Sequence, residues 1–128
     1  MSGYSVVNLK EIEDSAVKFG MSPSLEARFA RADLGADRSG ISYQRLAPNF
    51  RMPFGHDHED QEELYVILGG SGSVKLDDDV VDVKQWDVLR IAPATMRAVE
   101  AGDEGLELLA FGAGRAGDPT PQPGWWAD

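Results

Sequence analysis

Cysteine is absent from this chain of 128 residues, and histidine is rare, with only His56 and His58. The absence of cysteine excludes disulfide bonds and thiolate metal ligands, so any metal would have to bind histidine and carboxylate side chains. The sequence also contains no nucleophile beside a base, no phosphate-binding loop and no dinucleotide motif. We therefore expect no organic cofactor.

Basic residues are few, because 12 Lys and Arg stand against 22 Asp and Glu, which gives a formal net charge of −10. This balance argues against a nucleic-acid partner, since phosphate binding requires a cationic surface. No segment approaches the ~18 consecutive apolar residues of a membrane span, and residues 1–10 lack a basic region followed by an apolar one. We expect a cytoplasmic protein with no membrane partner.

Length and composition predict one domain, 1–128, with an ordinary core. Apolar residues make up 42% and charged residues 27% of the chain, as in soluble globular proteins. A chain of this size buries roughly 68% of the surface that its unfolded state exposes. The domain therefore needs no covalent crosslink.

Short segments rich in strand-forming residues alternate with Gly, Pro and Asp turns. Three consecutive acidic residues, Asp77, Asp78 and Asp79, predict a hairpin turn rather than a calcium loop, because the other ligands of such a loop are missing. Many short strands without a convincing long helix predict an all-β antiparallel barrel or sandwich. The expected strands are 41–46, 53–60, 63–68, 72–76, 80–84, 88–91, 95–101 and 106–111.

The flanking segments are less regular. Residues 1–24 are predicted to form an N-terminal arm over the domain, and residues 113–128 an irregular C-terminal tail whose Trp125-Trp126 pair docks on the barrel or on another subunit. Segment 25–34 fits both helical spacing and strand alternation. The turn that follows at 35–40 makes a hairpin the favoured prediction.

His56 and His58 carry the strongest functional signal. Two histidines two positions apart on a strand point to the same face. The carboxylate of Glu63, entering from the next strand, could meet both imidazoles and complete a two-histidine, one-carboxylate site for a transition metal. The alternative is a polar pocket without metal, in which both imidazoles are hydrogen-bonded.

The pattern His56-x-His58-x4-Glu63-x6-Gly70 resembles the first signature motif of the cupin superfamily. The second cupin motif contains Gly-Asp, Pro, His and Asn; the corresponding positions here hold Trp86-Asp87, Pro93, Arg97 and Ala101. The resemblance covers about residues 40–112, the expected barrel core. The resemblance is most specific in the first motif, where both the spacing of the ligands and the final glycine match the cupin pattern.

The resemblance implies a small antiparallel jelly-roll barrel of two sheets, often dimeric, with a metal in the barrel mouth. By position, His56, His58 and Glu63 match three of the four cupin metal ligands. Arg97 stands in the fourth position and cannot ligate, because arginine stays protonated. The metal expected is a divalent transition ion: Mn, Fe, Ni, Co or Zn.

Arg97 leaves three possibilities open. It could pair with Glu63 and replace the charge of the metal, which would make the barrel a metal-free binding or sensor module. It could instead lie beside a metal and clamp an anionic substrate. It could also point out of the barrel mouth into solvent.

Aromatic and Met side chains could surround the site. If Glu63 faces inward, alternation places Tyr65 and Ile67 inward, with Leu64, Val66 and Leu68 on the opposite face. That second apolar row must be covered by the arm or by a partner subunit, so we expect a homodimer. The candidate lining residues are Tyr43, Phe54, Tyr65, Trp86, Met96 and Phe111.

The predicted function is binding of a small, anionic or oxygenated molecule in the barrel mouth, with a divalent metal on His56, His58 and Glu63. Arg97, Tyr65, Phe54, Tyr43 and Met96 are the expected ligand-binding residues. An enzyme of this type would be an oxygenase, isomerase or hydrolase. The competing classes are the metal-free binding or sensor module, with Arg97 on Glu63, and a dimeric structural protein with a filled barrel.

Overall fold

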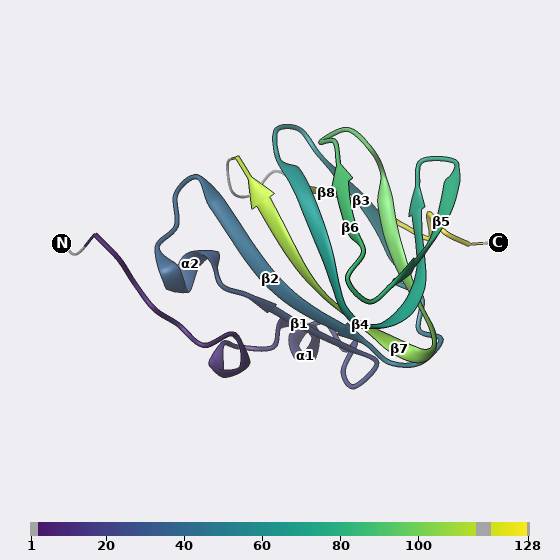
Figure 1. Ribbon diagram of the computed structural model, residues 1–128, viewed down its shortest axis with the longest axis horizontal. Coiled ribbons are helices and arrows are strands. Elements are labelled where there is room, and N and C mark those ends of the chain that lie inside the picture. The colour runs from purple at the N-terminus through teal and green to yellow at the C-terminus, as the bar shows by residue number, and fades with distance from the viewer. Residues whose placement is uncertain (1–2, 115–118, 128) are drawn as a thin grey trace.

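The computed structural model describes residues 3–114 and 119–127 and consists mainly of antiparallel strands that curl around a common interior (Figure 1). The prediction of a small all-β antiparallel barrel is confirmed. Three short helical turns also occur: η1 (Leu9–Glu11), α1 (Ser15–Lys18) and α2 (Arg31–Leu34). The strands are β1 (Leu25–Phe29), β2 (Ser39–Leu46), β3 (Phe54–His58), β4 (Glu62–Leu76), β5 (Asp79–Lys84), β6 (Val88–Ile91), β7 (Arg97–Ala113) and β8 (Pro119–Pro123).

Two long strands, β4 and β7, organise the barrel. They pair with each other, while β5 and β6 pair with β4, and β2 and β3 pair with β7. Hydrogen bonds therefore join the two expected sheets into one curled sheet. The predicted strand ends at Gly69-Gly70 and at residues 102–105 are wrong, because β4 and β7 continue through these positions with shifts of register.

Gly70 lies at one of these irregular positions and has a φ of 74°. A Cβ atom added at Gly70 would lie 2.0 Å from the carbonyl oxygen of Gly105 on β7. Only glycine avoids both the strained backbone and this collision. The glycine that ends the sequence motif therefore allows β4 and β7 to pass in close contact.

Segment 25–34 divides between its two predicted conformations. Leu25–Phe29 forms strand β1, which pairs antiparallel with β2. Arg31–Leu34 forms one helical turn, which ends at Gly35 in the left-handed conformation. The hairpin prediction is confirmed for the strand, and the turn at Asp77 and Asp78 joins β4 to β5 as expected.

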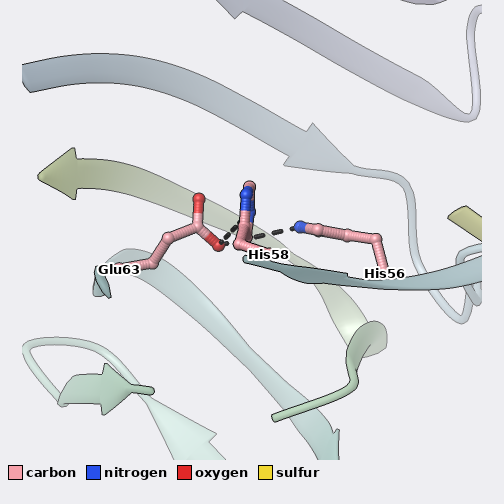
Figure 2. Close-up of side chains that lie close together, drawn as sticks. All are labelled: His56, His58 and Glu63. Atoms are coloured by element: carbon pink, nitrogen blue, oxygen red, sulfur yellow. Dashed lines mark ion pairs between the residues drawn. The ribbon is translucent and has the colours of Figure 1, made fainter. Parts of the chain in front are cut away.

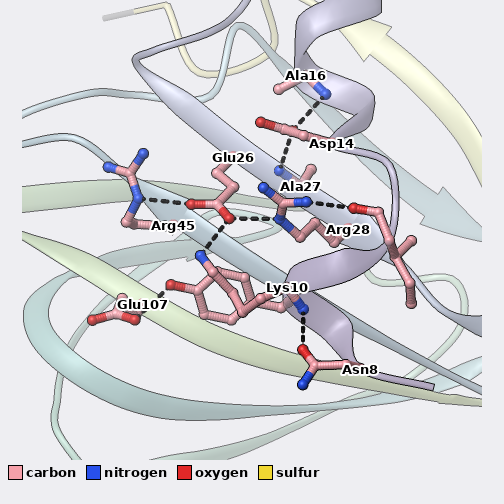
Figure 3. A network of polar contacts seen from close by, with 11 residues as sticks. Asn8, Lys10, Asp14, Ala16, Glu26, Ala27, Arg28, Arg45 and Glu107 are labelled. Carbon is pink, nitrogen blue, oxygen red and sulfur yellow. Dashed lines mark hydrogen bonds and ion pairs between the residues drawn. The ribbon is translucent and has the colours of Figure 1, made fainter. Parts of the chain in front are cut away.

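The N-terminal arm is fixed to the edge of the barrel by a polar network (Figure 3). The carboxylate of Glu26 on β1 accepts hydrogen bonds from Lys10, Arg28 and Arg45. Asp14 accepts from the backbone N–H of Ala16 in the arm and also from that of Ala27 on β1. The arm therefore lies against β1, and α1 is held next to the barrel interior.

The prediction of an irregular C-terminal tail is wrong for residues 119–123, which pair with β3 as strand β8. Trp126 is buried, with the Arg51 guanidinium over its ring, and Lys75 lies over the ring of Trp125. The tryptophan pair therefore docks on the barrel of its own chain. Residues 1–2 of the arm, with 115–118 and 128 of the tail, lie outside the described residues.

The core fills the interior between the strands. Its most deeply buried aliphatic side chains come from β2, β4, β6 and β7, and they are Leu46, Ile67, Val74, Ile91, Leu106 and Leu108. Within the described ranges, no helix has the length and apolar composition needed to cross a membrane.

Candidate metal centre

His56 and His58 lie on the same face of β3, as the strand period of two predicts. Glu63 enters from the start of β4, and its carboxylate points toward both rings (Figure 2). Oε1 of Glu63 is 3.7 Å from Nε2 of His56 and 3.3 Å from Nε2 of His58. The structure thus brings the three predicted metal ligands together.

The three side chains fit a small divalent metal. Their ligand atoms all lie within 4.8 Å of one another, and the imidazole rings meet edge to face with centroids 5.1 Å apart. Metal–nitrogen and metal–oxygen bonds of about 2.1 Å place neighbouring ligands of one ion roughly 3 Å apart. The two separations between the Glu63 carboxylate and the imidazoles, 3.3 and 3.7 Å, are near this value, and side-chain rotations would bring the three ligand atoms around one ion.

No second grouping of three or more His or acidic side chains with this compactness occurs in residues 3–114 and 119–127. The acidic turn Asp77–Asp79 in particular forms no such grouping, which agrees with its reading as a hairpin turn. Among the described residues, His56, His58 and Glu63 are therefore the one compact set of candidate metal ligands of this kind.

Arg97 is fully buried at the start of β7, directly opposite His56 in the strand register. Its Nη1 donates to Oε1 of Glu63 over 3.0 Å, and its Nη2 donates to the carbonyl oxygen of Ala92 over 2.8 Å. The possibility that Arg97 points into solvent is therefore wrong. Its pairing with Glu63, one of the two interior possibilities, is present.

Glu63 is ionised at neutral pH. Burial alone would raise the pKa of Glu63, but the adjacent imidazoles of His56 and His58 and the positive charge of Arg97 outweigh it and hold the pKa at about 2. Burial also raises the pKa of Tyr65 above its usual value, and the negative charge of Glu63 adds to this effect. Tyr65 is therefore a neutral phenol beside the carboxylate.

His56, His58 and Glu63 form part of the wall of a cavity of about 470 Å³. Phe54 and Tyr65, two of the predicted ligand-binding residues, also line it. The wall is completed by the arm, β1, α2, β2, β7, β8 and the residues just before β3 and β4. These contribute Ser15, Ala16, Phe19, Met21, Leu25, Ala27, Phe29, Arg31, Gly40, Ile41, Ser42, Gln44, Met52, Gln61, Ala110, Gly112, Pro119 and Pro121.

Three predicted ligand-binding residues are not part of this wall. Tyr43 lies between Ser42 and Gln44 but on the other face of β2, where its hydroxyl donates to Glu107. Met96 precedes β7, and its backbone N–H donates to Asp77. Arg97 lies behind Glu63 rather than at the cavity surface.

The sequence did not indicate that the arm and β1 would line the cavity. Phe19 and Met21 come from the arm, and Phe29 comes from β1. The alternation of Leu25, Ala27 and Phe29 was the one available signal, and all three line the cavity. Nothing local in residues 1–24 predicts their contact with the site, because that contact depends on where the arm packs.

The outer face of the sheet carries a row of apolar side chains. Tyr65 and Ile67 are buried inside the barrel, whereas Leu64 is 40% exposed on the other face, as alternation predicts. Val66 pairs with Val88 of β6 and with Leu109 of β7, and Leu64 pairs with Phe111. Val88 is 61% exposed, so the arm, which packs on β1, does not cover this row.

Neither Trp86 nor Phe111, both considered as pocket residues, belongs to the cavity wall. Trp86 is 69% exposed and has a φ of 75°. That left-handed conformation is one that glycine adopts readily. It accounts structurally for the glycine found at this position of the second cupin motif, which Trp86 replaces here.

Comparison with known proteins gives one relative by sequence and many by structure. No family model matches the sequence. An uncharacterised protein of Methanocaldococcus jannaschii is 38% identical over 55 residues, which make up 42% of this chain and 44% of that protein. The match thus spans less than half the length of that relative.

The solved structures superpose over most of this chain. A cupin protein from Bacteroides fragilis has a TM-score of 0.72 at 24% identity, with 91% of this chain and 88% of that chain covered. KdgF from Halomonas has a TM-score of 0.69 at 14% identity, with 87% and 95% covered. Oxalate decarboxylase from Bacillus subtilis has a TM-score of 0.74 at 18% identity, but this chain spans only 32% of it.

These similarities concern the fold. A protein from Klebsiella pneumoniae described as having a double-stranded β-helix domain also superposes, with a TM-score of 0.72 at 12% identity and with 91% of this chain and 96% of that chain covered. The resemblance to the cupins is therefore confirmed at the level of the fold: this chain is a cupin-type double-stranded β-helix.

Proposed function

We propose that this protein binds a small molecule through an anionic or oxygen-bearing group in the barrel cavity, with a divalent transition metal held by His56, His58 and Glu63. The observation that carries the proposal is the convergence of these three side chains at the wall of a cavity of about 470 Å³. Neutral imidazoles and a carboxylate suit Mn, Fe, Co, Ni or Zn.

The charges around the site favour an anionic ligand. Glu63 is ionised, and the buried Arg97 guanidinium balances its charge. A divalent metal, which would supply Lewis-acid chemistry when bound, adds two positive charges that a ligand oxygen can offset. Oxalate decarboxylase, similar to this chain in fold, is named for a small dicarboxylate.

A second candidate function is metal-free binding, and the hydrogen bond from Arg97 to Glu63 favours it. In this case the guanidinium supplies the positive charge that a metal would supply elsewhere, and the barrel acts as a non-enzymatic ligand-binding or sensor module. A buried carboxylate paired in this way does not need a metal to be compensated.

Elemental analysis separates the two candidates. We expect near-stoichiometric transition metal in protein purified without a His tag, loss of metal on chelation, and recovery when divalent ions are added back. His58→Ala should remove the metal, whereas Asp57→Ala, on the opposite face of β3, should retain it. Negligible metal before and after reconstitution would contradict the proposal and favour the Arg97-paired module.

We further propose that the protein is a homodimer formed through the outer apolar row of Leu64, Val66, Val88, Leu109 and Phe111. A second copy could cover these side chains by packing the same face against itself, as two-fold symmetry allows. Sedimentation equilibrium at high micromolar concentration should give the dimer mass, and Val88→Lys should shift it toward the monomer mass. A monomer mass for the wild-type protein would refute the dimer.

A further inference from the structure

We propose that the ligand of this cavity is amphipathic: one carboxylate-like head at His56, His58 and Glu63, and an unbranched or aromatic apolar body that extends toward the N-terminal arm. This inference rests on the proposed function, because the same site receives the head. It adds the chemical class of the rest of the ligand, which the three metal-site residues do not specify.

The cavity has one polar end and a mainly apolar remainder. The polar end holds the two imidazoles and Glu63, close together at the junction of β3 and β4. The rest of the wall is largely aromatic, Met and aliphatic, and its polar members are Ser15, Arg31, Ser42, Gln44 and Gln61. The large apolar members include Phe19, Met21, Leu25, Phe29, Met52 and Phe54.

The position of Phe54 links the two regions. It shares the inward face of β3 with His56 and His58, because each is two residues from the next. Phe54 therefore lies next to the head site, where a ligand held at the imidazoles can contact its ring. Contact with this ring favours an apolar segment next to the head rather than further hydroxyl groups, which would lose hydrogen bonds to water.

Two aromatic side chains at the cavity opening point to the same conclusion. Phe19 on the arm is 72% exposed and Phe29 on β1 is 53% exposed, although both line the cavity. Exposed aromatic rings from two separate segments at one opening form an apolar patch, which is typical of a ligand-binding site. An apolar ligand body in contact with these rings would remove part of their surface from water.

The wall lacks the cations that a polyanionic ligand requires. Among the described wall residues, Arg31 is the one Lys or Arg, and its Nη2 already donates to the carbonyl oxygens of Asp37 and Gly114. Arg97 lies behind Glu63 and does not reach the surface of the cavity. A sugar phosphate or other polyanion would thus find only the head site.

The volume of the cavity fits a ligand that has an apolar body in addition to its anionic head group. A cavity of about 470 Å³ lies within the roughly 300–1,000 Å³ range of pockets that enclose drug-sized ligands. A small dicarboxylate would leave most of this space to water against apolar walls. A medium-length monocarboxylate would fill both regions.

Isothermal titration calorimetry with a series of unbranched monocarboxylates, from acetate to decanoate below its micelle concentration, tests this inference. We expect affinity to rise about fourfold for each added methylene until the cavity is filled. Phe19→Ala and Phe29→Ala should weaken decanoate binding by about tenfold and leave acetate binding unchanged. Trp86→Ala, an equally exposed aromatic residue outside the wall, is the matched control and should change neither.

Affinity that does not depend on chain length, or an equal loss of decanoate binding in all three variants, would overturn the inference. The metal content of the same samples keeps this result separate from the proposed function. Stoichiometric metal without a chain-length dependence would refute the amphipathic ligand alone. A chain-length dependence without metal would support the apolar body and refute the metal on His56, His58 and Glu63.

Discussion

Arg97 donates from Nη1 to Oε1 of Glu63 over 3.0 Å, and the same carboxylate oxygen lies 3.3 Å from Nε2 of His58. A guanidinium and a divalent cation would therefore both interact with the same buried negative charge. Because Arg97 is fully buried and also donates to Ala92, it cannot simply turn into solvent when a metal binds. This relationship makes position 97 the most informative one to change.

Arg97→His should raise the affinity for divalent transition metal. The substitution removes a buried positive charge and offers an imidazole from the strand position opposite His56. We expect an increase of about tenfold or more, since changes even to the outer partners of metal ligands alter affinity by that much. Competition with a chelating indicator dye measures it. Arg97→Lys, which keeps the charge, should show no increase.

Arg97→Met should destabilise the metal-free protein. Glu63 would remain buried without its guanidinium partner, and breaking a buried pair in this way costs about 3–5 kcal/mol. Urea denaturation in the presence of chelator measures the free energy of unfolding. The double variant Arg97→Met/Glu63→Met should recover most of the loss. Equal destabilisation in the single and double variants would mean that the ion pair is not the cause.

The lowered pKa of Glu26 predicts that the protein loses stability in acid. Burial alone would raise the pKa of Glu26, but hydrogen bonds from Lys10, Arg28 and Arg45 outweigh it and hold the pKa at about 2, below its ordinary value of 4.5. Since the folded-state pKa is the lower one, ionised Glu26 stabilises the fold above pH 4.5, and this contribution is lost as the pH falls toward 2.

Glu26→Gln should therefore be less stable than the wild-type protein near neutral pH, with the difference shrinking as the pH falls from 4.5 to 2. Urea denaturation across this range measures the difference. Glu13→Gln is the control, because Glu13 pairs with Lys18 on the exposed surface. A Glu26→Gln difference that stays constant with pH would show that the ionised carboxylate does not hold the arm.

Gly70→Ala should destabilise the barrel by about 2–4 kcal/mol, since it combines a left-handed backbone with a collision. The added Cβ would lie 2.0 Å from the carbonyl oxygen of Gly105. Gly69→Ala is the matched control, because its Cβ would meet Glu107 Oε1 at an ordinary 3.6 Å. Thermal unfolding of both variants should separate them clearly. Equal melting temperatures would refute the tight passage of β4 past β7.

Trp86→Gly should stabilise the protein by about 1 kcal/mol. Trp86 holds a left-handed φ of 75°, which costs a residue with a Cβ about 1–2 kcal/mol relative to glycine. Its side chain is mostly exposed, so the change loses little packing. Chemical denaturation followed by circular dichroism gives the difference. A lower free energy of unfolding in the variant would mean that the indole makes contacts that outweigh the strain.

Local sequence rules predicted much of the site. A strand period of two is a property of the backbone alone, so the spacing of His56 and His58 was enough to place both on one face. The same rule placed Glu63, Tyr65 and Ile67 inside and Leu64 outside. These predictions depend only on neighbouring residues, and the structure agrees with each of them.

The ends of the long strands were harder to predict from the sequence. Gly69 and Gly70 resemble a turn in sequence, but β7 pairs with β4 on both sides of them and carries the strand through. The paired partner, and not the local composition, thus determines whether a glycine pair bends a strand or ends it. For the same reason the local composition of Pro119–Pro123 predicts an irregular segment, whereas its strand conformation comes from pairing with β3.

The residue pattern alone was enough to predict the cupin-type fold and to single out three candidate metal ligands. The pairing of Arg97 with Glu63, 34 residues away, and the presence of Phe19 and Phe29 in the cavity wall became visible in the folded chain. Side-chain direction along a strand is a local property, which is why the sequence could predict it. The partner of a buried charge and the wall of a cavity depend on how distant segments pack together.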